Sequence, residues 1–159
     1  MPTLRRHRGR RGRDPVSARS GEDELLRLAW DARARAYAPY SGFAVGAAIE
    51  TDAGVFTGAN VENAAYPTSI CAERAAGAAA VAAGARRFVA VAVASDTGPD
   101  GPPASPCGQC RQFLREFDDG LLTVVSESPS GERRRWTLTE LLPDSFGPDA
   151  LGVPAPGER

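Results

Sequence analysis

The sequence has 159 residues, of which 42% are hydrophobic and 25% charged, and a formal net charge of −1. This composition is ordinary for one globular domain. The chain contains no run of about 18 apolar residues, which a membrane span requires, and its first residues lack the apolar stretch of a secretory signal. We therefore expect a soluble, cytoplasmic protein of one domain, with no membrane partner.

Three cysteines and one histidine narrow the chemistry further. An odd number of cysteines in a chain of this length argues against a disulfide framework and favours thiols used in metal binding or catalysis. The single histidine, His7, lies in an arginine-rich leader, so the folded core has none. This excludes a Ser-His-Asp triad, a Cys-His protease pair and a zinc site with an imidazole ligand, unless the leader folds back onto the domain.

Charge is distributed unevenly along the chain. Residues 1–20 carry seven arginines against one acid, a net charge of +6, whereas residues 21–159 carry twelve arginines against nineteen acids, a net charge of −7. The leader is too poor in apolar residues to pack. We expect residues 1–20 to form a disordered tail, residues 21–151 the domain and residues 152–159 a flexible C-terminus, although an overextended gene start would also produce such a leader. Because the sequence has no lysine, lysine nucleophiles and Schiff bases are excluded.

Hydrophobic spacing, turn residues and helix stop signals divide the domain into alternating elements. We expect, in order, a helix over 22–38 ended by Pro39, a hairpin of residues 43–51 and 55–59, a polar loop over 60–70, an alanine-rich helix over 71–83 capped by Gly84, a buried central strand over 88–94, a loop over 96–106, a helix over 109–117, strands over 121–125 and 133–138, and a helical turn over 139–142. The alanine-rich helix has little side-chain volume, so we expect it to pack very closely against a sheet or a neighbouring subunit. This order predicts an α/β domain with a mixed sheet and helices on its faces.

All three cysteines fall where a helix is expected to begin. Cys71-Ala72-Glu73 opens the alanine-rich helix, and Pro106-Cys107-Gly108-Gln109-Cys110 opens the next one. Helix N-termini present free N–H groups and the positive end of the dipole, which favour thiolates. Three thiolates leave the fourth tetrahedral position of zinc open for water, as in a catalytic site. The placement of Glu73 suits a general acid and base beside that water.

This pattern, Cys-x-Glu followed by Pro-Cys-x-x-Cys, is similar to the zinc deaminase signature in its three-cysteine form. With it, the chain resembles the small homotetrameric cytidine deaminases from about residue 25 to residue 151. The segments that carry the resemblance are Tyr40-Ser41-Gly42-Phe43-Ala44-Val45-Gly46-Ala47-Ala48, Asn60-Val61-Glu62-Asn63-Ala64, Cys71-Ala72-Glu73-Arg74, Pro106-Cys107-Gly108-Gln109-Cys110-Arg111-Gln112 and Leu141-Leu142-Pro143-Asp144-Ser145-Phe146. The resemblance implies a three-layer α/β/α fold around a mixed five-stranded sheet. It also implies hydrolysis of cytidine and 2′-deoxycytidine to uridine and 2′-deoxyuridine plus ammonia, in pyrimidine salvage.

The resemblance further implies a role for each residue of the site. One Zn²⁺ per subunit would be bound by Cys71, Cys107 and Cys110, and Glu73 would carry a proton from the attacking water to N3 of the pyrimidine and then to the leaving amino group. Arg74 would bond to the thiolate sulfurs and offset their excess negative charge, and Arg111 has the same opportunity but ranks lower. The remaining roles are Asn60 and Glu62 on the ribose 3′-hydroxyl, Phe43 stacked on the base, the Ala72 backbone N–H on the pyrimidine carbonyl, and Tyr66 and Phe146 reaching into the site of a neighbouring subunit of the homotetramer.

Other interpretations of the same residues stay open. The cysteines could form a structural zinc site, although such a site usually has a fourth protein ligand and the core offers none. A deaminase of a cytosine-containing antibiotic nucleoside, of the blasticidin S type, would share the metal motif. The basic leader could belong to a nucleic-acid-binding zinc protein. Against this last interpretation, the domain is acidic and a buried 3′-hydroxyl contact leaves no exit for a 3′-phosphate, so we expect no nucleic-acid partner.

Overall fold

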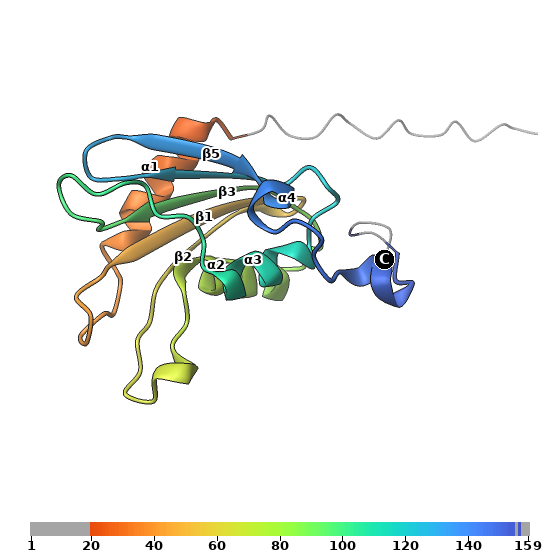
Figure 1. The fold of residues 1–159 in the computed structure, drawn as a ribbon, viewed down its shortest axis with the longest axis horizontal. Helices are drawn as coiled ribbons and strands as arrows, with labels where there is room; N and C mark the ends of the chain where they lie inside the picture. The colour runs from red at the N-terminus through yellow and green to blue at the C-terminus, as the bar shows by residue number, and fades with distance from the viewer. Residues whose placement is uncertain (1–19, 155, 157–159) are drawn as a thin grey trace, which may run out of the picture.

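A mixed sheet of five strands organises residues 20–154 and 156, the part of the chain that the computed structural model describes (Figure 1). The strand order is β2-β1-β3-β4-β5, and of the neighbouring pairs β3 and β4 are parallel while the others are antiparallel. In chain order the elements are α1 (Glu22–Arg33), β1 (Val45–Thr51), β2 (Gly54–Ala59), the 3₁₀ helix η1 (Tyr66–Thr68), α2 (Ala72–Ala82), β3 (Phe88–Ser95), α3 (Gly108–Arg115), β4 (Thr123–Glu127), β5 (Arg133–Thr137), α4 (Leu138–Leu141) and the 3₁₀ helix η2 (Pro148–Leu151).

The central strand β3 shows how the two faces of the sheet are divided. Val91 and Val93 belong to the apolar cluster under α2 and α3, whereas Ala92 and Ala94 belong to the cluster under α1. Successive side chains of a strand point to opposite faces, so β3 is buried on both. Figure 1 shows α1 on one side of the sheet and α2 and α3 on the other. The predicted three-layer α/β/α fold is confirmed.

The alanine-rich helix α2 lies unusually close to the sheet, as its sequence predicts. A Cβ atom at Gly58 of β2 would lie 2.4 Å from the backbone nitrogen of Ala76 and 2.6 Å from the backbone oxygen of Ala72. Only glycine allows this approach of helix backbone to strand backbone. The contact fixes the first turn of α2, where Cys71 and Glu73 lie, relative to the sheet.

Several element boundaries differ from those predicted, and hydrogen bonds account for two of the differences. The first helix ends at Arg33 rather than at residue 38, because the backbone of Tyr37 pairs with the loop that follows β2: its N–H donates to the carbonyl of Asn60 at 2.9 Å, and its carbonyl accepts from the N–H of Glu62 at 2.8 Å. Strand β4 begins at Thr123 rather than at residue 121, because the Asp118 carboxylate holds the N–H of Leu122 in a turn at 2.9 Å.

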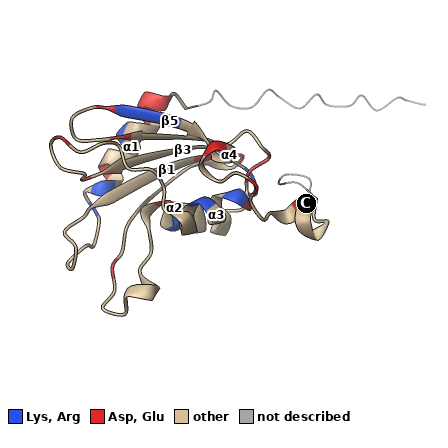
Figure 2. Cartoon of the chain, in the orientation of Figure 1, with Lys and Arg blue, Asp and Glu red and all other residues tan. Residues whose placement is uncertain are grey.

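The edge strand β5 is strongly basic (Figure 2), and its arginines are paired with acids. Arg133 bridges Asp23 of α1 at 2.6 Å and Glu127 of β4 at 2.5 Å, and Arg135 is paired with Glu22. These exposed pairs contribute little stability each. Charged side chains on an edge strand do, however, disfavour pairing with the edge of another sheet.

The start of the described chain is attached to the hairpin end of β1, where the N–H of Ser20 donates to the Glu50 carboxylate at 3.0 Å. The rest of the predicted tail, residues 1–19, lies outside the described residues, as do residues 155 and 157–159 of the predicted C-terminal segment. The three predicted domain boundaries therefore stay predictions. Within the described residues, no helix has the length and apolar character needed to cross a membrane.

Candidate functional site

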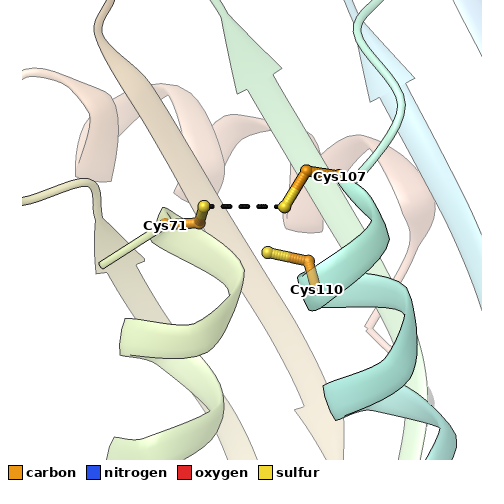
Figure 3. A group of neighbouring side chains, drawn as sticks. All are labelled: Cys71, Cys107 and Cys110. Atoms are coloured by element: carbon orange, nitrogen blue, oxygen red, sulfur yellow. Dashed lines mark hydrogen bonds between the residues drawn. The ribbon is translucent and has the colours of Figure 1, made fainter. Parts of the chain in front are cut away.

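Three thiols from two helix N-termini meet over one face of the sheet (Figure 3). Cys71 and Cys107 are the N-cap residues of α2 and α3, and Cys110 lies in the first turn of α3. Their sulfur atoms all lie within 4.8 Å of one another, and those of Cys71 and Cys107 are 3.8 Å apart. A tetrahedral zinc with Zn–S bonds of about 2.3 Å places its sulfur ligands about 3.8 Å apart. The cluster therefore has the donor atoms and the spacing of a zinc site, and within the described residues no other group of three acids, histidines or cysteines does.

The cluster favours negative charge on its sulfurs. A hydrogen bond from Cys110, with smaller contributions from Cys107 and from the positive charge of Arg74, lowers the pKa of Cys71 to about 6 against the opposing effect of burial. The same hydrogen bond, reinforced by burial, raises the pKa of Cys110. One thiolate is thus stabilised by two neighbouring thiols, and a divalent cation would take the place of their protons.

Glu73 brings a buried carboxyl group next to the thiols. It lies in the first turn of α2 and only 4% of its surface is exposed. Burial raises the pKa of Glu73, and the negative charge of Cys71 raises it further. A carboxyl group whose pKa is raised in this way can hold a proton and release it again, as a general acid and base must.

A cavity of about 260 Å³ opens in front of these groups. Of the predicted site residues, it is lined by Phe43, Asn60, Glu62, Cys71, Ala72, Glu73 and Cys107. Its other lining residues, which the sequence did not single out, are Val45, Val61, Ser69, Ile70, Val93, Ser95, Ala104 and Ser105. The alternation along β3 was the available signal for two of them, since Val93 and Ser95 share the face of Val91.

Asn60 and Glu62 brace the mouth of this cavity. The Asn60 side-chain oxygen accepts from the N–H of Val45 at 2.8 Å, and its amide donates to the carbonyl of Phe43 at 2.9 Å. The Glu62 carboxylate accepts from the N–H groups of Tyr40 and Ser41, at 2.9 and 3.2 Å, and from the Ser41 hydroxyl. These bonds lower the pKa of Glu62, the Ser41 hydroxyl contributing most. Both side chains retain hydrogen-bonding capacity toward the cavity, because the Asn60 amide has a second N–H and carboxylates accept several bonds.

The other predicted residues are not among those that line the cavity. Arg74 spans the two cysteine-bearing helices, donating to the side-chain oxygen of Gln109 at 3.1 Å. Tyr66 and Phe146 are 70% and 63% exposed. The ring of Tyr66 meets Tyr40 edge-on, with 5.8 Å between the ring centres.

The family described as the cytidine and deoxycytidylate deaminase zinc-binding region matches residues 19–126, which include the whole thiol cluster and Glu73. The chain belongs to this deaminase family. A cytidine deaminase from Sporosarcina psychrophila is 42% identical over 84% of this chain and 96% of its own, and one from Mycobacterium tuberculosis is 44% identical over 77% of this chain and 87% of its own. A crystal structure of cytidine deaminase from Burkholderia pseudomallei is 45% identical, covers 80% of this chain and 100% of its own, and has a TM-score of 0.74.

The predicted family and the zinc cofactor of this deaminase are therefore confirmed, together with its fold. Cys71, Cys107 and Cys110 are the group in the described residues that can hold the metal. The separate roles assigned to the individual residues of the deaminase site stay predictions.

Proposed function

We propose that this deaminase hydrolyses free cytidine and 2′-deoxycytidine to uridine and 2′-deoxyuridine plus ammonia, as a cytoplasmic enzyme of pyrimidine salvage. The observation that carries the proposal is the position of Glu73 and the thiol cluster at one cavity of about 260 Å³, close to the lower end of typical small-molecule sites. The cytidine deaminases that resemble this chain over most of its length support the reaction. No feature of the cavity favours an antibiotic nucleoside over cytidine.

The reaction needs a nucleophilic water and a group that moves protons. Zinc held by the three cysteines would supply a water acidic enough to act as a nucleophile at neutral pH. Glu73 would take a proton from the attacking water as the water oxygen bonds to C4, and would deliver that proton to N3. Glu73 then moves the remaining proton of the new C4 hydroxyl to the amino group, so that ammonia leaves and the C4 carbonyl of uridine forms. The raised pKa of the buried Glu73 suits a group that is protonated and deprotonated in each cycle.

We further propose that the cavity residues divide the nucleoside between them. Phe43 stacks on the pyrimidine, while Asn60 and Glu62 bind the ribose 3′-hydroxyl with the capacity their bracing bonds leave free. Ala72 is the first residue of α2, so its N–H has no acceptor within the helix and is available for the pyrimidine carbonyl. Arg74 offsets the excess negative charge of three thiolates on a dication, consistent with its effect on the pKa of Cys71.

We also propose a homotetramer in which neighbouring subunits complete each site. Tyr66 and Phe146 are exposed aromatic residues that lie outside the cavity of their own chain. Tyr66 is the first residue of η1, and the segment between β2 and α2 that contains η1 extends away from the body of the molecule in Figure 1. This placement suits residues that reach the cavity of a neighbouring subunit. Two measurements test the homotetramer: the mass of the protein in solution, and the nucleoside affinity of Phe146→Ala, which we expect to be lower than that of the wild type.

The decisive experiment follows the absorbance of cytidine, the release of ammonia and the formation of uridine with zinc-loaded protein. Glu73→Gln is the matched control, because it preserves size and hydrogen bonding but cannot shuttle the proton; we expect it to keep zinc and lose turnover. A zinc-loaded wild-type protein that leaves cytidine and 2′-deoxycytidine unchanged would overturn the proposal. Turnover of a blasticidin-type nucleoside in preference to cytidine would support the antibiotic alternative instead.

The nucleic-acid alternative requires the basic leader, residues 1–20, for activity, whereas the proposed nucleoside reaction does not. On the described domain, the arginines of β5 are paired with Asp23, Glu127, Glu132 and Glu22, so they offer a polyanion little free charge. We expect deletion of residues 1–20 to leave deamination unchanged. Loss of deamination together with loss of RNA binding in that deletion would favour a polynucleotide substrate.

A further inference from the structure

Arg111 of α3 joins two segments that are far apart in the sequence. Its Nε donates to the carbonyl of Pro106 at 2.7 Å and its Nη2 to the Ser105 hydroxyl at 2.8 Å, while its Nη1 donates to the carbonyl of Leu141 at 2.8 Å. Ser105 and Pro106 directly precede Cys107, and Leu141 is the last residue of α4. One guanidinium group therefore ties the loop that carries a zinc ligand to the C-terminal part of the chain.

The contacts of Arg111 are suited to placing atoms rather than to supplying charge. All three acceptors are neutral oxygens, and the planar guanidinium presents its donors in a fixed fork. Arg74 differs, because its positive charge lowers the pKa of Cys71. The two arginines beside the cluster thus act on it in different ways.

Cys107 is the ligand that depends most on such an anchor. Cys110 is buried within α3, whereas Cys107 is exposed at the end of the loop that precedes the helix. Packing therefore holds Cys107 weakly, and the position of its sulfur follows that of residues 105 and 106. The bonds from Arg111 fix these two residues.

Two other side chains of α3 bind the C-terminal segment but not the loop before Cys107. The Gln112 amide donates to the carbonyl of Phe146 at 2.9 Å, and Arg115 donates to the Ser145 hydroxyl at 3.0 Å and to the Asp149 carboxylate at 2.7 Å. Neither has a bond to the loop before Cys107 among the contacts of the described residues. Arg115 is thus a natural comparison for Arg111, since it has the same side chain, on the same helix, bound to the same segment.

We propose that Arg111 is a positioning residue that sets the place of Cys107 in the zinc cluster by tying the loop before Cys107 to Leu141 at the end of α4. The proposal rests on the zinc site of the proposed function. It implies that loosening Arg111 weakens the hold on zinc.

The test compares zinc-loaded Arg111→Met, Arg111→Lys and Arg115→Met with the wild type, and measures the rate of zinc transfer to a chromogenic chelator. We expect both Arg111 variants to release zinc about 10–100-fold faster, the usual effect of removing a group that orients a metal ligand, and Arg115→Met to release it at the wild-type rate. In a fourth variant, Arg111→Ala, low millimolar guanidinium should slow the zinc release, because the ion takes the place of the missing side chain between the three oxygens. Melting curves establish whether each variant is folded. If Arg111→Met does not fold, the zinc release rate of Arg111→Lys decides the test.

Wild-type release rates in folded Arg111→Met and Arg111→Lys would overturn the proposal. Retention of zinc by Arg111→Lys alone would also overturn it, because charge rather than fork geometry would then be responsible. The readout is independent of turnover. A wild-type protein that is zinc-loaded but inactive contradicts the proposed reaction, while the release rates still decide the role of Arg111.

Discussion

Gly58 is the residue through which the sheet sets the position of the zinc-binding helix, and Gly58→Ala tests this directly. The added Cβ would lie 2.4 Å from the nitrogen of Ala76 and 2.6 Å from the oxygen of Ala72, both backbone atoms of α2. Because ordinary contacts begin near about 3.5 Å, α2 must move away by about 1 Å. Overpacking of this kind costs about 1–3 kcal/mol of unfolding free energy. A displacement of about 1 Å also exceeds the tolerance of a catalytic site and can lower the rate about 100-fold.

The assay combines urea unfolding with kcat/KM for cytidine, and Ala48→Val is the matched control. Ala48 lies on β1 opposite Thr57, the neighbour of Gly58, but faces the cluster under α1. Its extra methyl groups should cost a similar amount of stability and leave the zinc-bearing helices in place. We expect activity to fall in Gly58→Ala alone. Equal loss of stability in both variants with unchanged kcat/KM in Gly58→Ala would show that Gly58 does not set the position of the zinc-binding helix, as would an equal loss of activity in Ala48→Val.

Three further outcomes are expected. Burial raises the pKa of Glu73 above its ordinary value of 4.5, so the folded metal-free protein binds more protons than the unfolded chain and loses stability as the pH rises through the interval between the two pKa values. Glu73→Gln should remove this loss and be the more stable protein above that interval in urea melts of the metal-free forms. A wild type with the same dependence of stability on pH as the variant would contradict this expectation. Asn60→Ala removes the hydrogen bonds to Val45 and Phe43, so it should raise KM and thereby lower kcat/KM in steady-state kinetics with cytidine. An effect confined to kcat would contradict a role of Asn60 in binding. Phe88 is fully buried at the start of β3, and Phe88→Ala should lower the unfolding free energy by about 3–5 kcal/mol, whereas a loss below about 1 kcal/mol would show that the core closes over the space.

The thiol cluster could be predicted from the sequence because local structure determines it. Cys71 and Cys107 each stand where a strong helix signal begins. The two helices follow β2 and β3, which run in the same direction on either side of β1, so both helices begin at the same edge of the sheet. The close packing of α2 was predictable from its alanine content, although the partner, Gly58, was not. What these features share is that they follow from the helix and strand pattern within a few residues of each position.

Contacts between distant segments could not be predicted in this way. Nothing near Tyr37 indicates that its backbone pairs with residues 60–62 and thereby ends α1 early. Arg74 follows Glu73 and Arg111 follows Cys110, and the resemblance to the deaminase family ranked Arg74 first. The difference between them arises from the loop before Cys107 and from Leu141, which meet Arg111 only once the chain has folded.

The hydrogen bond between Ser20 and Glu50 holds the beginning of the domain at a distance from the cavity. Glu50 lies at the hairpin end of β1, whereas Val45, at the other end of the same strand, lines the cavity. Five residues of strand separate the two by about 17 Å. A fluorophore or affinity handle fused ahead of Ser20 is therefore tethered at the opposite end of this strand from the nucleoside, which makes that position suitable for immobilising the enzyme with its cavities open to solvent.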